Sequence, residues 1–169
     1  MHITKRQEKT LNELAKPLEN LINSIKNASD DDLPKVLNSN LVWDTSKGTL
    51  LNWVDILNKF DSILEGIIKK YELADENVKP TELDAKDTTL TVAILDFTYM
   101  LLDNSSNKSV YSSSHRLYDL LASPTIPVIK GVLKCFVVLG KKYSIRSMKR
   151  TFVATRKVSD RVYPLELLI

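Results

Sequence analysis

Apolar residues recur every three or four positions along most of this chain, which is the spacing of one face of an α-helix. The clearest run covers residues 49–73. Its apolar stripe consists of Leu50, Trp53, Val54, Leu57, Phe60, Leu64, Ile67, Ile68 and Tyr71. Large aromatic side chains dominate core packing, so we expect Trp53 and Phe60 in the protein interior. The run predicts one long amphipathic helix, preceded by a polar loop that contains Trp43.

The same spacing predicts further helical segments on both sides of this run. They cover residues 4–27, 31–38, 87–103, 112–123 and 126–141. Pro17 interrupts the first segment, and because proline is tolerated in the first turn of a helix, it is expected to open a second helical piece. The polar residues 74–84 are typical of a loop. No stretch of the sequence alternates apolar and polar residues as a strand would, so the pattern predicts an all-α fold.

Capping residues and apolar content refine three of these boundaries. Asp87 or Thr88 is expected to cap the helix that runs to about residue 103, and Thr125 the helix that follows it at 126. The segment 126–141 is apolar on nearly all sides, so it is expected to lie buried between neighbouring helices. Gly140 is the expected end of that segment.

Short connections between helices indicate how the segments are arranged. Only a few residues separate segments 112–123 and 126–141, and such short connections place helices side by side and antiparallel. Antiparallel pairs with a buried second member suit an armadillo/HEAT-like α-solenoid segment. Because the sequence shows no clean internal repeat, a closed helical bundle is a second possible architecture.

Length and composition narrow the class of protein. The chain has 169 residues, of which 43% are hydrophobic and 27% are charged. About 150 residues make one domain, and this mixture is too apolar for a disordered chain. The single cysteine, Cys135, excludes an intramolecular disulfide and a zinc site built on several thiolates. With two histidines in the chain, we expect neither a metal nor a cofactor.

Three groups of residues are candidate chemical sites. Cys135 lies in the most apolar segment, where burial makes a thiol inert, so we expect it in the core. His115 follows the serines 112–114, which we interpret as a helix start because no orienting carboxylate or oxyanion loop accompanies them. The adjacent aspartates 30–32 could bind a cation, but they also favour the start of a helix, which is the preferred interpretation. The sequence therefore predicts no catalytic, cofactor-binding or metal-binding residue.

Charge divides the chain into two unequal parts. Residues 1–140 carry 16 basic and 19 acidic residues, whereas residues 141–169 carry eight basic and two acidic ones. We interpret this as a helical solenoid segment over 1–141 and a basic tail over 142–169. The tail could bind nucleic acid or act as a nuclear-import signal. The preferred interpretation of the charge run alone is a solvated connector or the polar face of a further helix, which could be the start of a further repeat.

The N-terminal sequence bears on location. Residues 1–9 are charged and lack an apolar centre, so they do not form a secretory signal peptide. The most apolar stretch, residues 128–139, contains two lysines and is shorter than the roughly 20 residues that span a bilayer. We therefore expect a protein of the nucleus and cytoplasm that has no membrane partner.

Two blocks of the sequence resemble a known family. The first is Val-Trp-Asp at 42–44 followed by Leu-Asn-Trp-Val-Asp-Ile-Leu-Asn-Lys-Phe-Asp-Ser-Ile-Leu at 51–64. The second is Ala-Ile-Leu-Asp-Phe-Thr at 93–98, with Val-Tyr-Ser-Ser at 110–113 and Leu-Leu-Ala-Ser at 120–123. In order and spacing they resemble the N-terminal region of the giant HECT-type E3 ubiquitin ligases, the Tom/Mule group. The resemblance extends over roughly residues 17–141.

This resemblance implies a fold and a role. In that family the region is an armadillo-like part of a long solenoid that recruits substrates and scaffolds the enzyme. Catalysis belongs to a HECT domain at the far C-terminus, for which this chain has no room. Cys135 and Phe136 match a residue pair of the family's catalytic motif, but Lys134 stands where that motif has a threonine. No functional residue of the family is therefore carried over to this chain.

The predicted function follows from these expectations. We expect a non-catalytic segment that recruits or scaffolds protein partners, namely ubiquitination substrates and the rest of a ligase solenoid. The apolar residues 163–169 at the end of the chain are interpreted as a repeat cut short, and hence the chain as a fragment of a longer ligase. The alternative is a stand-alone helical protein that binds nucleic acid through its basic tail.

Overall fold

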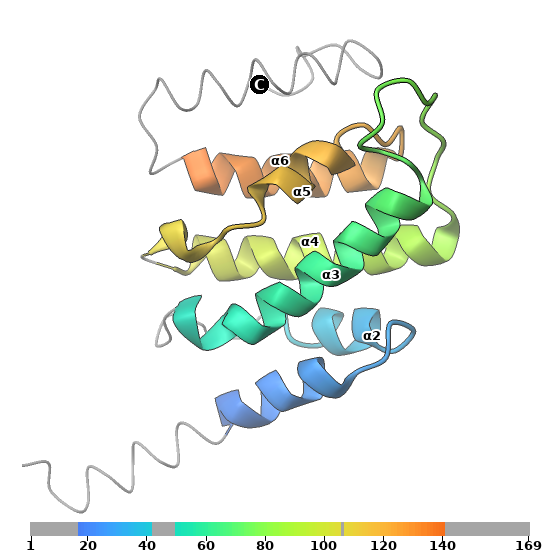
Figure 1. Cartoon of the computed structure of the whole chain (residues 1–169). Coiled ribbons are helices and arrows are strands. Elements are labelled where there is room, and N and C mark those ends of the chain that lie inside the picture. The colour runs from blue at the N-terminus through green and yellow to red at the C-terminus, as the bar shows by residue number, and fades with distance from the viewer. Residues whose placement is uncertain (1–16, 42–49, 106, 141–169) are drawn as a thin grey trace, which may run out of the picture.

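The computed structural model describes residues 17–41, 50–105 and 107–140, and all regular structure within them is helical (Figure 1). Residues 17–27 form the first helical stretch. The other elements are α2 (Leu33–Asn38), the 3-10 turn η1 (Leu50–Trp53), α3 (Val54–Lys70), α4 (Ala85–Asp103), the 3-10 turn η2 (Lys108–Val110), α5 (Ser114–Leu120) and α6 (Ile126–Gly140). The all-α prediction is confirmed for the described part of the chain.

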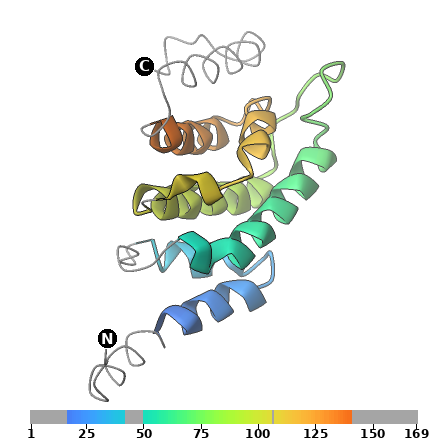
Figure 2. The same ribbon diagram turned by 60° about the vertical axis from the view of Figure 1, so that its left-hand side comes forward.

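The helices stack in layers rather than closing into a bundle (Figures 1 and 2). Helix α4 packs against α2 on one side and α6 on the other, while α3 packs against α5. The stretch 17–27 lies against α3. Each layer therefore consists of two helices consecutive in sequence: 17–27 with α2, α3 with α4, and α5 with α6. This succession of helix pairs is a solenoid-like arrangement, as the short connections predicted.

Among the helices that the structure describes, α4 is the most deeply buried, which corrects the expectation that segment 126–141 would be buried on all sides. Ten residues of α4 are buried: Leu90, Thr91, Ala93, Ile94, Leu95, Phe97, Thr98, Met100, Leu101 and Leu102. Helix α6 instead leaves Ile126 and Val137 49% and 58% exposed. The two helices differ in burial because α4 lies between α2 and α6, whereas α6 is the last helix that the structure describes.

An aromatic cluster joins η1 and α3 to α4 within the second layer. Trp53, at the end of η1, is only 2% exposed. Its ring meets the ring of Phe97 edge-on with 5.6 Å between centroids, and Phe60 approaches Phe97 at 6.1 Å. Trp53 and Phe60 are thus in the interior, as predicted. Trp43 lies outside the described residues.

The two ends of the α3–α4 connection differ from the predicted ones. Helix α3 ends at Lys70 because Glu72 adopts a left-handed backbone with φ of 52°, and the Leu73 amide then donates to the Ile68 carbonyl at 3.0 Å. Helix α4 begins at Ala85, and its cap is Asp84 rather than Asp87 or Thr88. The Asp84 carboxylate accepts the Asp87 amide at 2.7 Å, so Asp87 occupies the first turn of the helix.

The ends of α5 and α6 are closer to expectation. Helix α5 is shorter than predicted, at Ser114–Leu120, and α6 spans Ile126–Gly140 with Pro127 in its first turn. Thr125 precedes α6, but its hydroxyl accepts the Leu83 amide at 2.9 Å. That bond ties the start of α6 to the loop that leads into α4.

Lys59 is one of the side chains that link the first layer to the second. The Lys59 ammonium on α3 donates to the carbonyl oxygens of Ile25, Lys26 and Ala28 at 2.9, 3.0 and 2.6 Å. The Ile25 and Lys26 carbonyls belong to the last turn of the stretch 17–27 and Ala28 follows it, so the Lys59 ammonium supplies a donor to carbonyls at the end of this helix, where intrahelical partners run out. The neighbouring ion pair between Lys26 and Asp55, at 3.3 Å, is exposed and adds little.

Candidate protein-interaction surface

The one cysteine of the chain is part of the core. Cys135 is fully buried in α6, and its thiol donates to the Leu95 carbonyl of α4 at 3.5 Å. Burial raises the pKa of Cys135 to about 12. The nucleophilic thiolate is therefore a negligible fraction of this cysteine at neutral pH. The predicted core position of Cys135 is confirmed, and the side chain is not placed to react.

The serines before α5 do not form a hydrolytic site. His115 lies exposed in the first turn of α5, and the N-cap residue Ser113 makes no side-chain capping bond. Ser113 instead hydrogen-bonds the carboxylate of Asp61 on α3. The expectation of capping chemistry here is therefore wrong for Ser113, because a neighbouring helix offers its hydroxyl a carboxylate.

Asp61 also receives both sides of an arginine fork. Arg116 of α5 donates to its two oxygens at 3.3 and 3.4 Å and reaches Glu65 at 3.2 Å. Burial pushes the pKa of Asp61 upward, but the hydrogen bonds from Ser113 and Arg116 outweigh it, and the pKa lies below its usual value. These hydrogen bonds and ion pairs hold α5 against α3.

The three adjacent aspartates, residues 30–32, lie at the start of α2, in agreement with the interpretation of these residues as a helix start. Asp32 is the N-cap residue of α2 and accepts the Ser29 hydroxyl at 2.8 Å. Asp31 pairs with Lys86 of α4 at 2.6 Å. Within the described ranges, no three His, Cys, Asp or Glu side chains are grouped so as to hold a metal ion.

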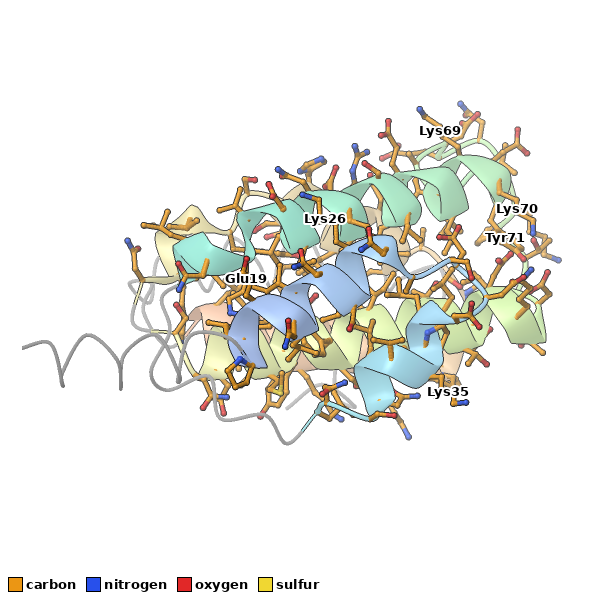
Figure 3. All side chains as sticks on the ribbon, turned by 90° about the horizontal axis from the view of Figure 1, so that it is seen from below. Glu19, Lys26, Lys35, Lys69, Lys70 and Tyr71 are labelled. Carbon is orange, nitrogen blue, oxygen red and sulfur yellow. The ribbon has the colours of Figure 1, made fainter. Side chains whose placement is uncertain are left out.

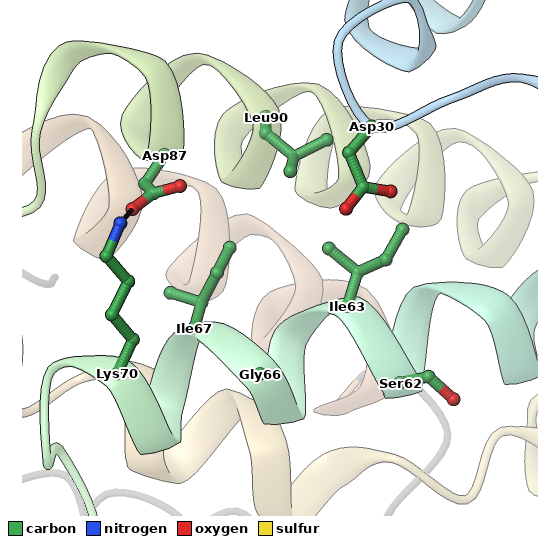
Figure 4. A pocket seen from close by; sticks show the side chains of 8 residues that line it. All are labelled: Asp30, Ser62, Ile63, Gly66, Ile67, Lys70, Asp87 and Leu90. Atoms are coloured by element: carbon green, nitrogen blue, oxygen red, sulfur yellow. Dashed lines mark hydrogen bonds and ion pairs between the residues drawn. The ribbon is translucent and has the colours of Figure 1, made fainter.

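A groove lies where the loop before α2 approaches α3 and α4 (Figure 4). Its volume is about 360 Å³. Apolar side chains form its floor, and Gly66 of α3 leaves open space, because a Cβ at that position would meet nothing within 4 Å. The residues that line the groove are Asp30, Ser62, Ile63, Gly66, Ile67, Lys70, Asp87 and Leu90.

A hydrogen-bonded network builds one wall of this groove. Lys70 reaches Asp87 Oδ2 at 2.6 Å and Asp84 at 3.6 Å. The Tyr71 hydroxyl donates to the same Asp87 oxygen at 2.7 Å and accepts the Asp84 amide at 3.1 Å. The hydrogen bond that Lys70 donates to the Asp87 carboxylate raises the pKa of Lys70 above its usual range. Figure 3 shows Lys70 and Tyr71 together at the end of α3.

The groove was not found from the sequence. Its residues come from three separate stretches: the loop before α2, the second half of α3 and the start of α4. One local signal was present. Gly66 is a glycine inside a strongly periodic helix, and glycine weakens a helix interior by about 1 kcal/mol relative to alanine. A position that carries this cost invites a search for open space beside it.

Two further expectations concern membrane spans and the basic tail. Across 17–41, 50–105 and 107–140, no helix has the length and apolar character needed to cross a bilayer. The tail at 142–169 lies outside the described residues, and so does the N-terminal part of the first predicted helix.

Comparison with known proteins supplies the family. A family model described as Domain of Unknown Function (DUF908) matches residues 86–165. The Probable E3 ubiquitin-protein ligase TOM1 of Eremothecium gossypii is 27% identical to this chain over 99% of the chain's length. E3 ubiquitin-protein ligase HUWE1 of Mus musculus is 31% identical over 88% of this chain. The E3 ubiquitin-protein ligase ptr1 of Schizosaccharomyces pombe is 35% identical over 61% of it. The chain is homologous to the N-terminal region of the giant HECT-type E3 ubiquitin ligases.

The matched share of these ligases is small. The chain spans 5% of the Eremothecium protein, 4% of the mouse protein and 3% of the Schizosaccharomyces protein. The DUF908 match begins in the first turn of α4 and continues past the end of α6. The groove lies mostly on the N-terminal side of that match, with Asp87 and Leu90 inside it.

Proposed function

We propose that this chain is a non-catalytic, armadillo-like segment that binds proteins for ubiquitination and helps to scaffold the ligase. The observation that carries the proposal is the similarity to E3 ubiquitin-protein ligases along 88–99% of the chain. Stacked helix pairs suit this role, because they present extended side-chain surfaces on a rigid frame.

The chemistry of the described residues supports binding rather than catalysis. The buried thiol of Cys135 is protonated at neutral pH, and the cluster around Asp61 is occupied by its own partners. Ubiquitin transfer by a HECT-type enzyme needs an accessible thiolate to form a thioester. The proposal therefore assigns to this segment the holding of partners, while another part of a ligase acts on them.

The test is a graft into a related ligase. In E3 ubiquitin-protein ligase TOM1 of Saccharomyces cerevisiae, which is 32% identical over 63% of this chain, the matched residues are replaced by the chain. Two further versions of the same ligase are made. One lacks the matched residues, and the other carries the graft with Trp53→Ala. Ubiquitin-remnant mass spectrometry of cells then compares the conjugated proteins.

We expect the intact graft to restore at least half of the conjugates lost on deletion, and the Trp53→Ala graft to restore none. The altered graft is a control for simple spacer length, because it keeps the number of residues and disturbs the fold. If deletion leaves the conjugates unchanged, or if both grafts restore them equally, the proposed function is wrong.

A further inference from the structure

We propose that the groove between α3 and α4 binds one arginine side chain from a basic segment of a partner protein. This inference rests on the proposed function and names the partner chemistry of one surface. The groove's volume of about 360 Å³ lies near the lower end for ligand pockets, so it suits a single side chain better than a whole small molecule.

The floor of the groove suits the stem of such a side chain. Ile67 and Leu90 are buried beneath it, and Ile63 is half-buried at its edge. Gly66 between Ile63 and Ile67 adds no side chain, so the groove stays open along α3. Arginine and lysine lay their methylene stems along apolar surface while the charged group stays in contact with polar partners.

The rim of the groove suits the charged head. Asp30 has no hydrogen bond or ion pair within the described ranges, and in Figure 4 it stands beside Leu90 with Asp87 on the other side. Lys70 and Tyr71 both contact Oδ2 of Asp87, which leaves Oδ1 outside these two bonds. A cation that enters along Leu90 thus meets one carboxylate oxygen of Asp87 and the whole carboxylate of Asp30.

Charge around the groove favours a basic partner. Four aspartates stand at or beside it, namely Asp30, Asp31, Asp84 and Asp87, against two lysines, Lys70 and Lys86. Arginine fits better than lysine, because its planar fork can donate to two carboxylate oxygens at once. A partner segment with a central arginine and further basic residues therefore matches the groove in both size and charge.

The test uses the full chain, labelled with nitrogen-15, and two fluorescein-labelled peptides. Both peptides read Gly-Ser-Lys-Leu-X-Leu-Lys-Ser-Gly, with X either arginine or citrulline, which keeps the stem and removes the charge. Fluorescence anisotropy measures affinity, and amide NMR shifts locate the contact. We expect the arginine peptide to bind about tenfold more tightly than the citrulline peptide. The shifts should centre on Ile63, Gly66, Ile67 and Leu90.

Three variants make the site falsifiable. Gly66→Leu fills the groove and should abolish the arginine preference, while its melting temperature stays at or above that of the parent, because leucine favours a helix more than glycine does. Asp30→Asn should weaken the arginine peptide about tenfold. Glu19→Gln removes the same charge from an exposed position on residues 17–27 and should leave the affinity within twofold.

Several outcomes would overturn the inference. Equal affinity for the two peptides, equal loss in Asp30→Asn and Glu19→Gln, or shifts centred away from the groove would each show general charge attraction instead of a site. The graft separates this failure from failure of the proposed function. If the grafted ligase keeps its conjugates with Gly66→Leu, the groove is dispensable while the scaffold role stands.

Discussion

Trp53→Ala is expected to lower the free energy of unfolding by about 3–5 kcal/mol. The indole is 2% exposed and contacts the edge of Phe97, so its removal leaves a cavity among helices that are already packed. A loss of this size is a large part of the roughly 5–15 kcal/mol that holds a domain together. Urea denaturation followed by circular dichroism at 222 nm measures it.

The control for this prediction lies two residues away. Leu51 belongs to the same 3-10 turn but is 63% exposed. Leu51→Ala should change the unfolding free energy by less than about 0.5 kcal/mol. A loss below about 1 kcal/mol for Trp53→Ala would contradict the burial of the aromatic cluster and point to an exposed indole.

Gly131→Leu is expected to destabilise the contact between α4 and α6 by about 1–3 kcal/mol. A Cβ at position 131 would lie 3.0 Å from both Cβ and Cδ1 of Leu95, which is tighter than most Cβ contacts, so Leu95 would have to shift and the rest of a leucine side chain would crowd it further. Leucine favours a helix by about 1 kcal/mol over glycine, so the steric cost must exceed that gain to be seen. Thermal unfolding followed by circular dichroism compares the variants.

Gly66→Leu is the matched control, because Gly66 also lies within a helix but faces open space. The two substitutions should move the melting temperature in opposite directions, down for Gly131→Leu and level or up for Gly66→Leu. If both raise it, α6 does not approach α4 as closely as the structure has it.

Local pattern was a good guide to which residues are inside and a poor guide to how deeply each helix is buried. The spacing of three and four predicted Trp53 and Phe60 in the core, because residues at that spacing lie on one side of a helix. It also made segment 126–141 the most apolar one, yet α4 is the more buried. Burial depends on how many helices flank an element, and the sequence of that element does not encode this number.

The start of α4 shows a second limit. Asp84 and Asp87 are both capable caps. Ala85 and Lys86, which lie between them, are good helix formers. Local propensity therefore fits either boundary. Packing decides, since Tyr71 and Lys70 of α3 bind Asp87 and the Tyr71 hydroxyl accepts the Asp84 amide.

The groove could not have been assembled from the sequence. Asp30, Gly66 and Asp87 are separated by tens of residues and meet only because the first helix pair stacks on the second. The resemblance of two sequence blocks to a ligase family did foresee the relationship that the comparisons established. The aromatic positions that carried the resemblance include Trp53, Phe97 and Tyr111, which the structure buries in the core.

Whether this chain acts by binding and not by covalent chemistry is tested most directly by offering it ubiquitin. The full chain is mixed with a ubiquitin-charged E2, with the catalytic domain of a HECT-type ligase as a positive control, and products are separated without reductant. Because Cys135 is buried and its pKa is raised to about 12, we expect no ubiquitin adduct on the chain while the control forms one. A reducible adduct that disappears with Cys135→Ala would contradict this view of the protein.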